Sequence, residues 1–151
     1  MELPPIRHRR ARRTDADAVW TLLSDAGIEA PAEDRTGLRR FRRLVADLGG
    51  DLYLAERDAS LVGLVHITYA RHLLAGQRAT LALLVVAPEA RRCGVGAGLI
   101  DLAAARARRR GCPLLAWPGS DAAACGRDWL RRRGWREVGA HLLVDLTGAA
   151  G

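Results

Sequence analysis

The residues whose types and spacing most directly suggest chemistry lie between positions 84 and 100. This segment reads LVVAPEARRCGVGAGLI, so an apolar run passes through a proline into a glycine-punctuated loop and then into a helical pattern. The first backbone N–H groups of a helix have no intrahelical acceptor and sit at the positive end of its dipole. Gly94 and Gly96 leave those groups accessible, and Arg91 and Arg92 add cationic donors, so the segment predicts a phosphate site.

Two common nucleotide-binding loops do not match this segment. The pattern GxxxxGK[ST] is excluded because the chain contains no lysine. The pattern GxGxxG, begun at Gly94, would require a third glycine where Leu99 stands. A different kind of phosphate loop is therefore indicated.

The pattern R-x-x-G-x-G at 91–96, preceded by V-x-P at 86–88, resembles motif A of the GNAT superfamily of N-acetyltransferases. The order of elements, the chain length and a Gly134-Trp135 pair after the last helix extend this resemblance over most of the chain. The resemblance implies acetyl-CoA as cosubstrate and no metal. It places the pantetheine arm along the backbone of Leu84, Val85 and Val86, and the pyrophosphate within a loop made of Arg91, Arg92, Cys93, Gly94, Val95, Gly96 and Ala97.

The catalytic residues of the superfamily are matched less well. Many members carry a carboxylate, acting directly or through water, on the strand that corresponds to 79–86, and this segment has none. The tyrosine that protonates the leaving thiolate in the family falls on Leu130. Substitutes must then lie elsewhere, and we consider Tyr69 and His72.

Tyr69 becomes a candidate through the expected pairing of two strands. If the turn at 71–78 is symmetric, Tyr69 lies opposite Thr80, which brings its hydroxyl to the face of the reacting thioester, and His66 points the other way. A one-residue slip would exchange these two side chains, and either residue could simply pack beneath a helix. His72, in the turn itself, could accept a proton near pH 7 or be solvated.

The pattern of the whole chain predicts an α/β fold that positions this loop. Helical periodicity follows Thr14 and Pro31, and strand-like segments occupy 6–11, 52–56, 61–69 and 79–86. A helix should follow Gly96, then a strand at 113–116, a helix at about 121–133 and strands at 135–138 and 141–146. We expect one GNAT-like domain over 1–151, with a mixed, mostly antiparallel sheet of six to seven strands and helices on both faces.

Composition agrees with a single folded domain and with a cytoplasmic location. The chain has 151 residues, of which 49% are hydrophobic and 27% charged. Its three cysteines lack CxxC spacing, which indicates reduced thiols and no zinc site. The N-terminus has no apolar leader, and no segment is apolar over a membrane-spanning length, so no membrane partner is expected.

The net charge of +7 comes from arginine alone, and it admits two readings. It could reflect codon usage, or it could attract a polyanion. The arginines are dispersed among several elements, with 39–43 predicted to form a solvated helix face, and they are not interleaved with aromatic residues. A nucleic-acid-binding module is therefore the weaker alternative, and no nucleic-acid partner is expected.

The sequence predicts an acetyl-CoA-dependent N-acetyltransferase that transfers acetyl directly to a primary amine of a small molecule or peptide. The alternative within the same fold is a CoA-binding protein with weak or no catalysis, because of Ala82 and Leu130. A homodimer is compatible with the sequence. No motif encodes the acceptor.

Overall fold

The computed structural model describes residues 2–29, 35–119 and 124–139. The chain divides into two compact units, residues 1–117 and residues 118–151. The first unit holds the sheet and the glycine loop, and the second holds one described helix.

The described elements of the first unit alternate much as their hydrophobic periodicity predicts. They are β1 (Arg7–Arg10), the 3-10 turn η1 (Arg13–Asp15), α1 (Ala16–Asp25), α2 (Arg35–Ala46), β2 (Gly50–Arg57), β3 (Ser60–His72), β4 (Gly76–Val86), the 3-10 turn η2 (Pro88–Ala90), α3 (Val95–Arg109) and β5 (Leu115–Ala116). Asp15, and not Thr14, is the N-cap residue of α1, and its carboxylate accepts the backbone N–H of Arg12.

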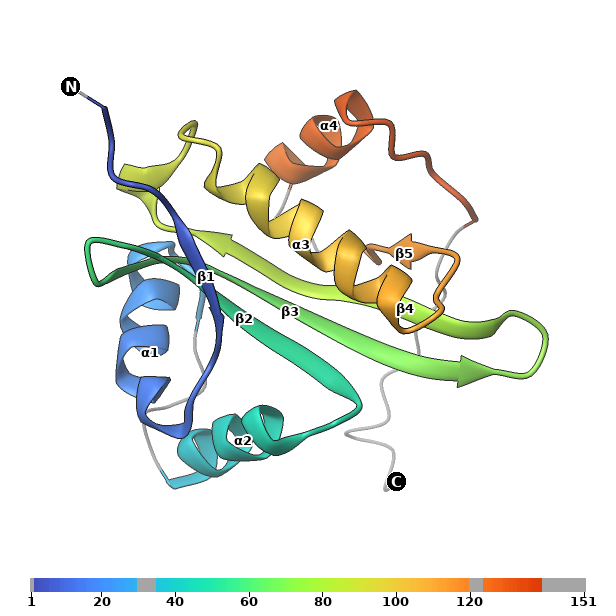
Figure 1. Cartoon of the computed structure of the whole chain (residues 1–151), viewed down its shortest axis with the longest axis horizontal. Coiled ribbons are helices and arrows are strands. Elements are labelled where there is room, and N and C mark those ends of the chain that lie inside the picture. The colour runs from blue at the N-terminus through green and yellow to red at the C-terminus, as the bar shows by residue number, and fades with distance from the viewer. Residues whose placement is uncertain (1, 30–34, 120–123, 140–151) are drawn as a thin grey trace, which may run out of the picture. The chain divides into compact units, whose positions relative to one another are not determined.

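The strands form one sheet in the order β1-β2-β3-β4-β5 (Figure 1). All pairs are antiparallel except β4–β5, which is parallel. The mixed, mostly antiparallel sheet is confirmed, but the expectation of six to seven strands is wrong for the described residues, which form five. Residues 135–138 are described and are not a strand, and the strand predicted at 141–146 lies outside the described residues.

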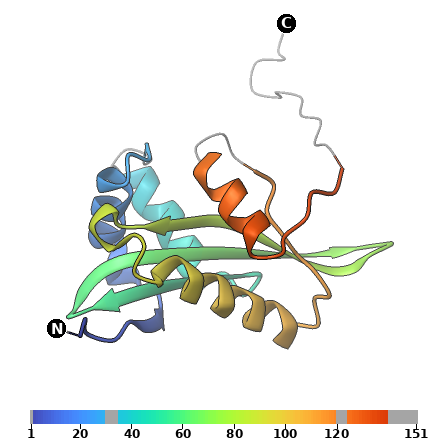
Figure 2. The same ribbon diagram turned by 90° about the horizontal axis from the view of Figure 1, so that it is seen from above.

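Helices cover both faces of the sheet, as expected. α1 and α2 lie on one face and α3 lies on the other (Figure 2). The side of β3 toward α3 is set by Gly63, because a Cβ at that position would lie 3.0 Å from the side chains of both Leu99 and Val95. Glycine therefore lets the start of α3 approach the middle of the sheet closely.

The core of the first unit is aliphatic, as the scarcity of aromatic residues implies. On the α1 and α2 face it includes Leu54 and Leu64, and Trp20 of α1 meets Phe41 of α2 edge to face at 6.0 Å. None of the helices in the described residues combines the length and the apolarity needed to cross a bilayer.

The described part of the second unit consists of α4 (Ala124–Arg132) and the segment that follows it. The helix ends at Gly134, whose φ is +90°, and the N–H of Trp135 donates to the carbonyl of Leu130 at 3.1 Å. This is the helix end that a glycine in the left-handed region favours. It agrees with the helix predicted to stop at the Gly-Trp pair.

Candidate functional site

The predicted phosphate loop begins a helix whose N-terminus is free of side-chain caps. Gly94 is the N-cap residue of α3 and has a φ of +81°, which explains why glycine stands there. The first intrahelical bond runs from the N–H of Gly98 to the carbonyl of Gly94 at 3.0 Å. The N–H groups of Val95, Gly96 and Ala97 therefore have no intrahelical acceptor, and they can donate to an anion.

The side chains around this helix end are open to solvent. Residues 91–94 are exposed, and nothing lies within 4 Å of where a Cβ on Gly94 would stand. Arg91 Nε donates to the carbonyl of Val86 at 3.3 Å, which holds this arginine beside the loop. Cys93 is an exposed free thiol, and its Sγ donates to the carbonyl of Arg91 at 3.5 Å. The charge and the free donors of this loop fit a phosphate group.

The edge of β4 next to this loop is open over most of its length. Strand β5 pairs with β4 only at Ala79 and Thr80, so in the described part of the chain the edge from 81 to 86 has no ladder partner. On the opposite edge, the N–H of Ala87 bonds to the carbonyl of Val62 in β3. Because backbone groups alternate between the two edges of a strand, those of Leu84 and Val86 point outward. An amide-bearing chain can pair there.

The register of β3 and β4 differs from the expected one, and the difference exchanges two candidate residues. Tyr69 lies opposite Ala79 and not opposite Thr80, so the pairing predicted from a symmetric turn is wrong. The register then shifts between His66 and Ile67, and His66 pairs with Leu83. Ala82 is left as the extra residue of a β-bulge.

Tyr69 and His66 lie on opposite faces of β3, and the register of the hairpin decides which of them shares the face of Thr80. Gly63 faces α3, and side chains alternate along the strand, so Tyr69 also faces α3 while His66 and Thr68 face the other way. Thr80 pairs with Thr68 and therefore shares the face of His66. The expectation that Tyr69 shares the face of Thr80 is therefore wrong, and His66 shares that face instead.

Tyr69 takes part in a buried polar cluster built around Asp51. Its hydroxyl donates to Asp51 Oδ2 at 2.7 Å, and the guanidinium of Arg110 lies 4.2 Å from the centre of its ring. The Asp51 side chain has no exposed surface and forms ion pairs with Arg10, Arg106 and Arg110 at 2.9, 3.1 and 3.4 Å. We call these five residues the Asp51 cluster.

The protonation of this cluster is set by its charges. Burial alone would raise the pKa of Asp51, but the hydrogen bonds from Tyr69 and Arg106 and the charges of Arg106 and Arg10 outweigh it, so the pKa is lowered. Burial and the bond to Asp51 raise the pKa of the Tyr69 hydroxyl. A phenol held in this way is a weaker acid than a free tyrosine, and the cluster joins β1, β2, β3 and α3 through Asp51.

His72 is the last residue of β3 and organises the turn that follows it. Its Nδ1 accepts the backbone N–H groups of Leu74 and Ala75 at 3.3 and 3.2 Å. It pairs with Gly76, ten residues before the end of β4 at Val86, which is about 33 Å along an extended strand. His72 thus lies at the end of the hairpin that is remote from the glycine loop.

His66 is the ionisable group that the register shift brings to the face of Thr80. It is half-buried, and no hydrogen-bond partner for its ring is found among the described residues. Burial lowers its pKa, and the negative charge of Asp47 offsets part of that effect. The imidazole is therefore held neutral near pH 7, in the form that accepts a proton.

Among the described residues, no group of three or more His, Cys, Asp or Glu side chains could hold a metal ion. Cys112 is a buried free thiol whose pKa is raised by burial. The free N–H groups at the start of α3 can donate to an anion, and the imidazole of His66 can accept a proton.

The sequence model of the acetyltransferase (GNAT) family matches residues 16–135, which include the loop, the open strand edge and α4. The chain belongs to the GNAT family. A search of curated proteins found no significant match. The match to the family model confirms the GNAT assignment that was predicted from the spacing of glycines and arginines.

Solved structures share this GNAT fold at low sequence identity. A transcriptional regulator from Bacillus halodurans C-125 superposes with a TM-score of 0.83 at 21% identity, covering 94% of this chain and 100% of the other. A ribosomal-protein-alanine N-acetyltransferase from Brucella melitensis biovar Abortus 2308 gives 0.77 at 20%, covering 94% and 99%. A predicted acetyltransferase from Clostridium acetobutylicum, solved with acetyl-CoA, gives 0.76 at 19%, covering 97% and 100%.

Two positions where this GNAT sequence departs from the family pattern can be located in the structure. Thr80 is half-buried and Ala82 is exposed in the bulge, so β4 carries no carboxylate at either position. Leu130, at the position of the family tyrosine, is 5% exposed. Its place is that of a core residue.

Proposed function

We propose that the protein is an acetyl-CoA-dependent N-acetyltransferase that transfers acetyl directly to a primary amine. The observation that carries this proposal is the uncapped N-terminus of α3, with Arg91 and Arg92 beside it and an unpaired edge of β4 leading away from it. Family membership and the likeness to a structure solved with acetyl-CoA support it. A cytoplasmic location stays a prediction.

The residues of the loop and of the strand edge would bind the cosubstrate. The N–H groups of 95–97 and the two loop arginines would hold the pyrophosphate, and the outward backbone groups of Leu84 and Val86 would pair with the pantetheine amides. Acetyl-CoA supplies an activated acyl group when bound. Holding it along β4 orients that group toward the bulge at Ala82 and the amine that approaches it.

His66 is proposed as the residue that accepts the proton of the attacking amine. It lies opposite Leu83, which is three residues or about 10 Å from the end of β4, whereas Tyr69 is opposite Ala79, seven residues or about 23 Å away. A primary amine is mostly protonated at pH 7 and must lose a proton before it attacks. The neutral imidazole of His66, whose Nε2 lies 3.7 Å from where a Cβ on Gly50 would stand, would remove it through water.

Binding of the cosubstrate is tested with a pair of glycine variants matched in backbone strain. Gly94 and Gly27 both have positive φ and open space where a Cβ would stand, so alanine strains either position similarly. We expect Gly94→Ala to weaken acetyl-CoA binding in calorimetry by about tenfold, and Arg91→Gln to do the same by removing a charge-assisted bond. Gly27→Ala should bind as the wild type does. Equal affinity in all four proteins would refute the assignment of the loop.

The proposed base is tested by the pH dependence of kcat/KM with a panel of amines, followed by release of free CoA thiol. With His66 as base, the wild-type profile bends below about pH 6.5, because the pKa of His66 is lowered, and His66→Gln removes the bend. His72→Gln is the control and should leave the bend in place. If only His72→Gln removes it, or if kcat/KM rises without a bend in the wild type, His66 is not the base.

A second candidate function is CoA binding with little or no acetyl transfer. It is favoured by the absence of a carboxylate at Thr80 and Ala82 and by Leu130 at the position of the family acid. The same assay separates the two functions, because tight acetyl-CoA binding without thiol release from any amine would support the second one.

A further inference from the structure

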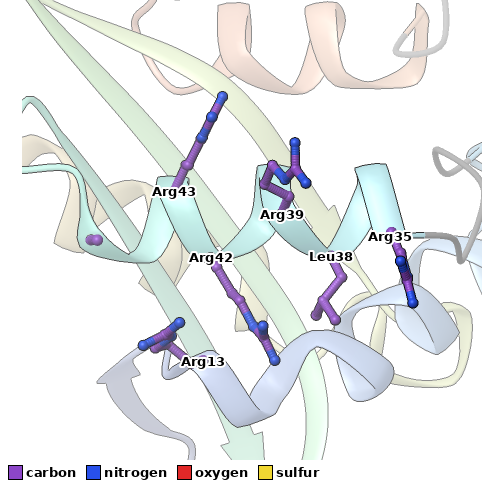
Figure 3. A pocket seen from close by; sticks show the side chains of 7 residues that line it. Arg13, Arg35, Leu38, Arg39, Arg42 and Arg43 are labelled. Atoms are coloured by element: carbon purple, nitrogen blue, oxygen red, sulfur yellow. The ribbon is translucent and has the colours of Figure 1, made fainter.

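A pocket of about 660 Å³ is lined by residues of α2 and η1. The helix α2 lies on the opposite face of the sheet from α3 (Figure 2). Five arginines line the pocket together with the aliphatic groups of Leu38 and Ala46. Four of the arginines come from α2, and the fifth comes from η1. Figure 3 shows Arg42 and Leu38 pointing from α2 toward the segment that carries Arg13. We call Arg13, Arg35, Arg39, Arg42 and Arg43 the arginine pocket.

The charges of the arginine pocket have no counterions within the described residues. None of its five guanidinium groups forms a salt bridge to a described carboxylate, whereas arginines elsewhere, such as Arg9, do so. The helix α2 itself, RTGLRRFRRLVA, contains no acidic residue. Arg35 also lies in its first turn, where the helix dipole disfavours a cation.

The arginines of α2 are spaced so that charges of the same sign are neighbours on the helix surface. Residues three and four apart on a helix are neighbours, so Arg39 lies beside Arg35, Arg42 and Arg43 with charges of the same sign. Solvated helix faces usually carry charges of both signs, and opposite charges three or four residues apart attract one another. Arg13, which comes from a different element, increases the repulsion further. A bound anion would neutralise it.

The chemistry of the lining favours a compact phosphate ligand. Arginine presents planar, paired donors that match phosphate oxygens two at a time. The volume is that of a small-molecule site. The lining contains no aromatic ring on which a nucleic-acid base could stack. We propose that the arginine pocket binds a compact ligand carrying two or more phosphate groups, separately from the α3 loop.

The test is calorimetric titration of the full chain with inorganic triphosphate. Arg39→Gln and Arg42→Gln should each weaken binding about tenfold. The matched control is Arg40→Gln, which removes the same charge from the same helix at a position outside the pocket lining. It should change the affinity less than about threefold, because only nonspecific attraction is lost. Melting temperatures recorded without ligand show whether each variant is folded.

Three outcomes would overturn the proposal. Equal weakening by Arg39→Gln and Arg40→Gln would reveal a diffuse basic surface. Loss of triphosphate binding in Arg91→Gln, or its displacement by CoA, would place the anion in the α3 loop. If citrate binds as tightly as triphosphate, the pocket has no preference for phosphate groups over carboxylates.

Single-stranded RNA provides the remaining comparison. If a 12-nucleotide RNA binds more than tenfold tighter than triphosphate, and Arg39→Gln and Arg40→Gln weaken it equally, the surface is a nucleic-acid interface and the pocket proposal fails. Triphosphate binding that depends on Arg39 but is unaffected by CoA supports the pocket. That result does not depend on acetyl transfer, so the proposed enzymatic function can fail independently.

Discussion

The Asp51 cluster and the arginine pocket use the same residue type under opposite electrostatic conditions. In the cluster, three guanidinium groups surround one carboxylate with no exposed surface, and two of them also lie over the ring of Tyr53. In the pocket, five guanidinium groups have no described carboxylate partner. Arginine therefore holds the sheet to α3 in one place and has no described carboxylate partner in the other.

The two regions differ in how much their arginines contribute to stability. A buried carboxylate with several cationic partners is costly to disturb, because removing it leaves the partners uncompensated. A group of like charges in solvent costs little to reduce and has little effect on folding. Substitutions in the two regions should consequently differ in size, sign and dependence on pH and salt.

The largest effect is expected from Asp51→Asn. It removes the charge shared by Arg10, Arg106 and Arg110 and weakens the acceptor of the Tyr69 hydroxyl. We expect a loss of about 2–4 kcal/mol in the free energy of unfolding, measured in urea. Asp47→Asn is the control, since this exposed side chain keeps an oxygen that can accept the N–H of Gly49. A similar small loss in both variants would remove the distinction between the two regions.

A smaller effect is expected from Arg106→Gln. Arg106 donates through Nε to Asp51 and lies over Tyr53, and its side chain is only 20% exposed. The variant should lose about 1–2 kcal/mol of unfolding free energy, because Arg110 and Arg10 still compensate the carboxylate. Arg108→Gln, two positions along α3 at an exposed site, should change it by less than about 0.5 kcal/mol. Comparable losses in thermal or urea unfolding would show that burial is not the deciding factor.

The cluster should contribute to the pH dependence of stability and the pocket should not. The pKa of Asp51 is lowered in the folded state, so the unfolded state binds more protons in acid, and stability falls as the pH falls below about 4. Asp51→Asn should make this decline shallower, as followed by urea unfolding between pH 6 and pH 3. Arg39→Gln should leave the slope unchanged, because arginine does not titrate in this range.

The smallest effect is the response of the arginine pocket to salt. Raising sodium chloride from 0.05 to 0.5 M screens the repulsion among neighbouring arginines of α2, so the wild type should gain a few tenths of a kcal/mol. Arg39→Gln removes three of these pairs, and its gain should be smaller. Thermal unfolding at the two salt concentrations measures both. A larger gain in Arg39→Gln than in the wild type would contradict the repulsion inferred for α2.

Local sequence signals predicted the glycine loop well and the catalytic face poorly. The loop could be predicted because a helix start after Gly94 and the adjacent arginines are consecutive in the chain, and a family pattern covers them. Whether Tyr69 shares the face of Thr80 depends on the length of the turn after His72, which hydrophobic alternation does not encode. One residue of register was enough to exchange Tyr69 and His66.

Long-range polar contacts were also beyond the sequence patterns. No local pattern marks Asp51 as buried, because an acidic residue after Gly49-Gly50 is typical of a solvated turn. It lies inside because β1 and α3, 41 and 55 residues away in the chain, both bring arginines to it. The predicted solvated face at 39–43 is exposed, but the approach of Arg13 from η1 could not be predicted from the periodicity of α2.

The glycine at position 63 has a consequence for how the loop at 91–97 can change during evolution. Its missing side chain sets the height of α3 above β3, because a methyl group there would meet Val95, the first residue of the helix, and the carbonyl oxygen of Val85 at 3.0 Å. The position of the N–H groups of the loop thus depends on position 63 having no side chain. Any change at this interior position also moves the N–H groups at the start of α3, so the loop and the core cannot vary independently.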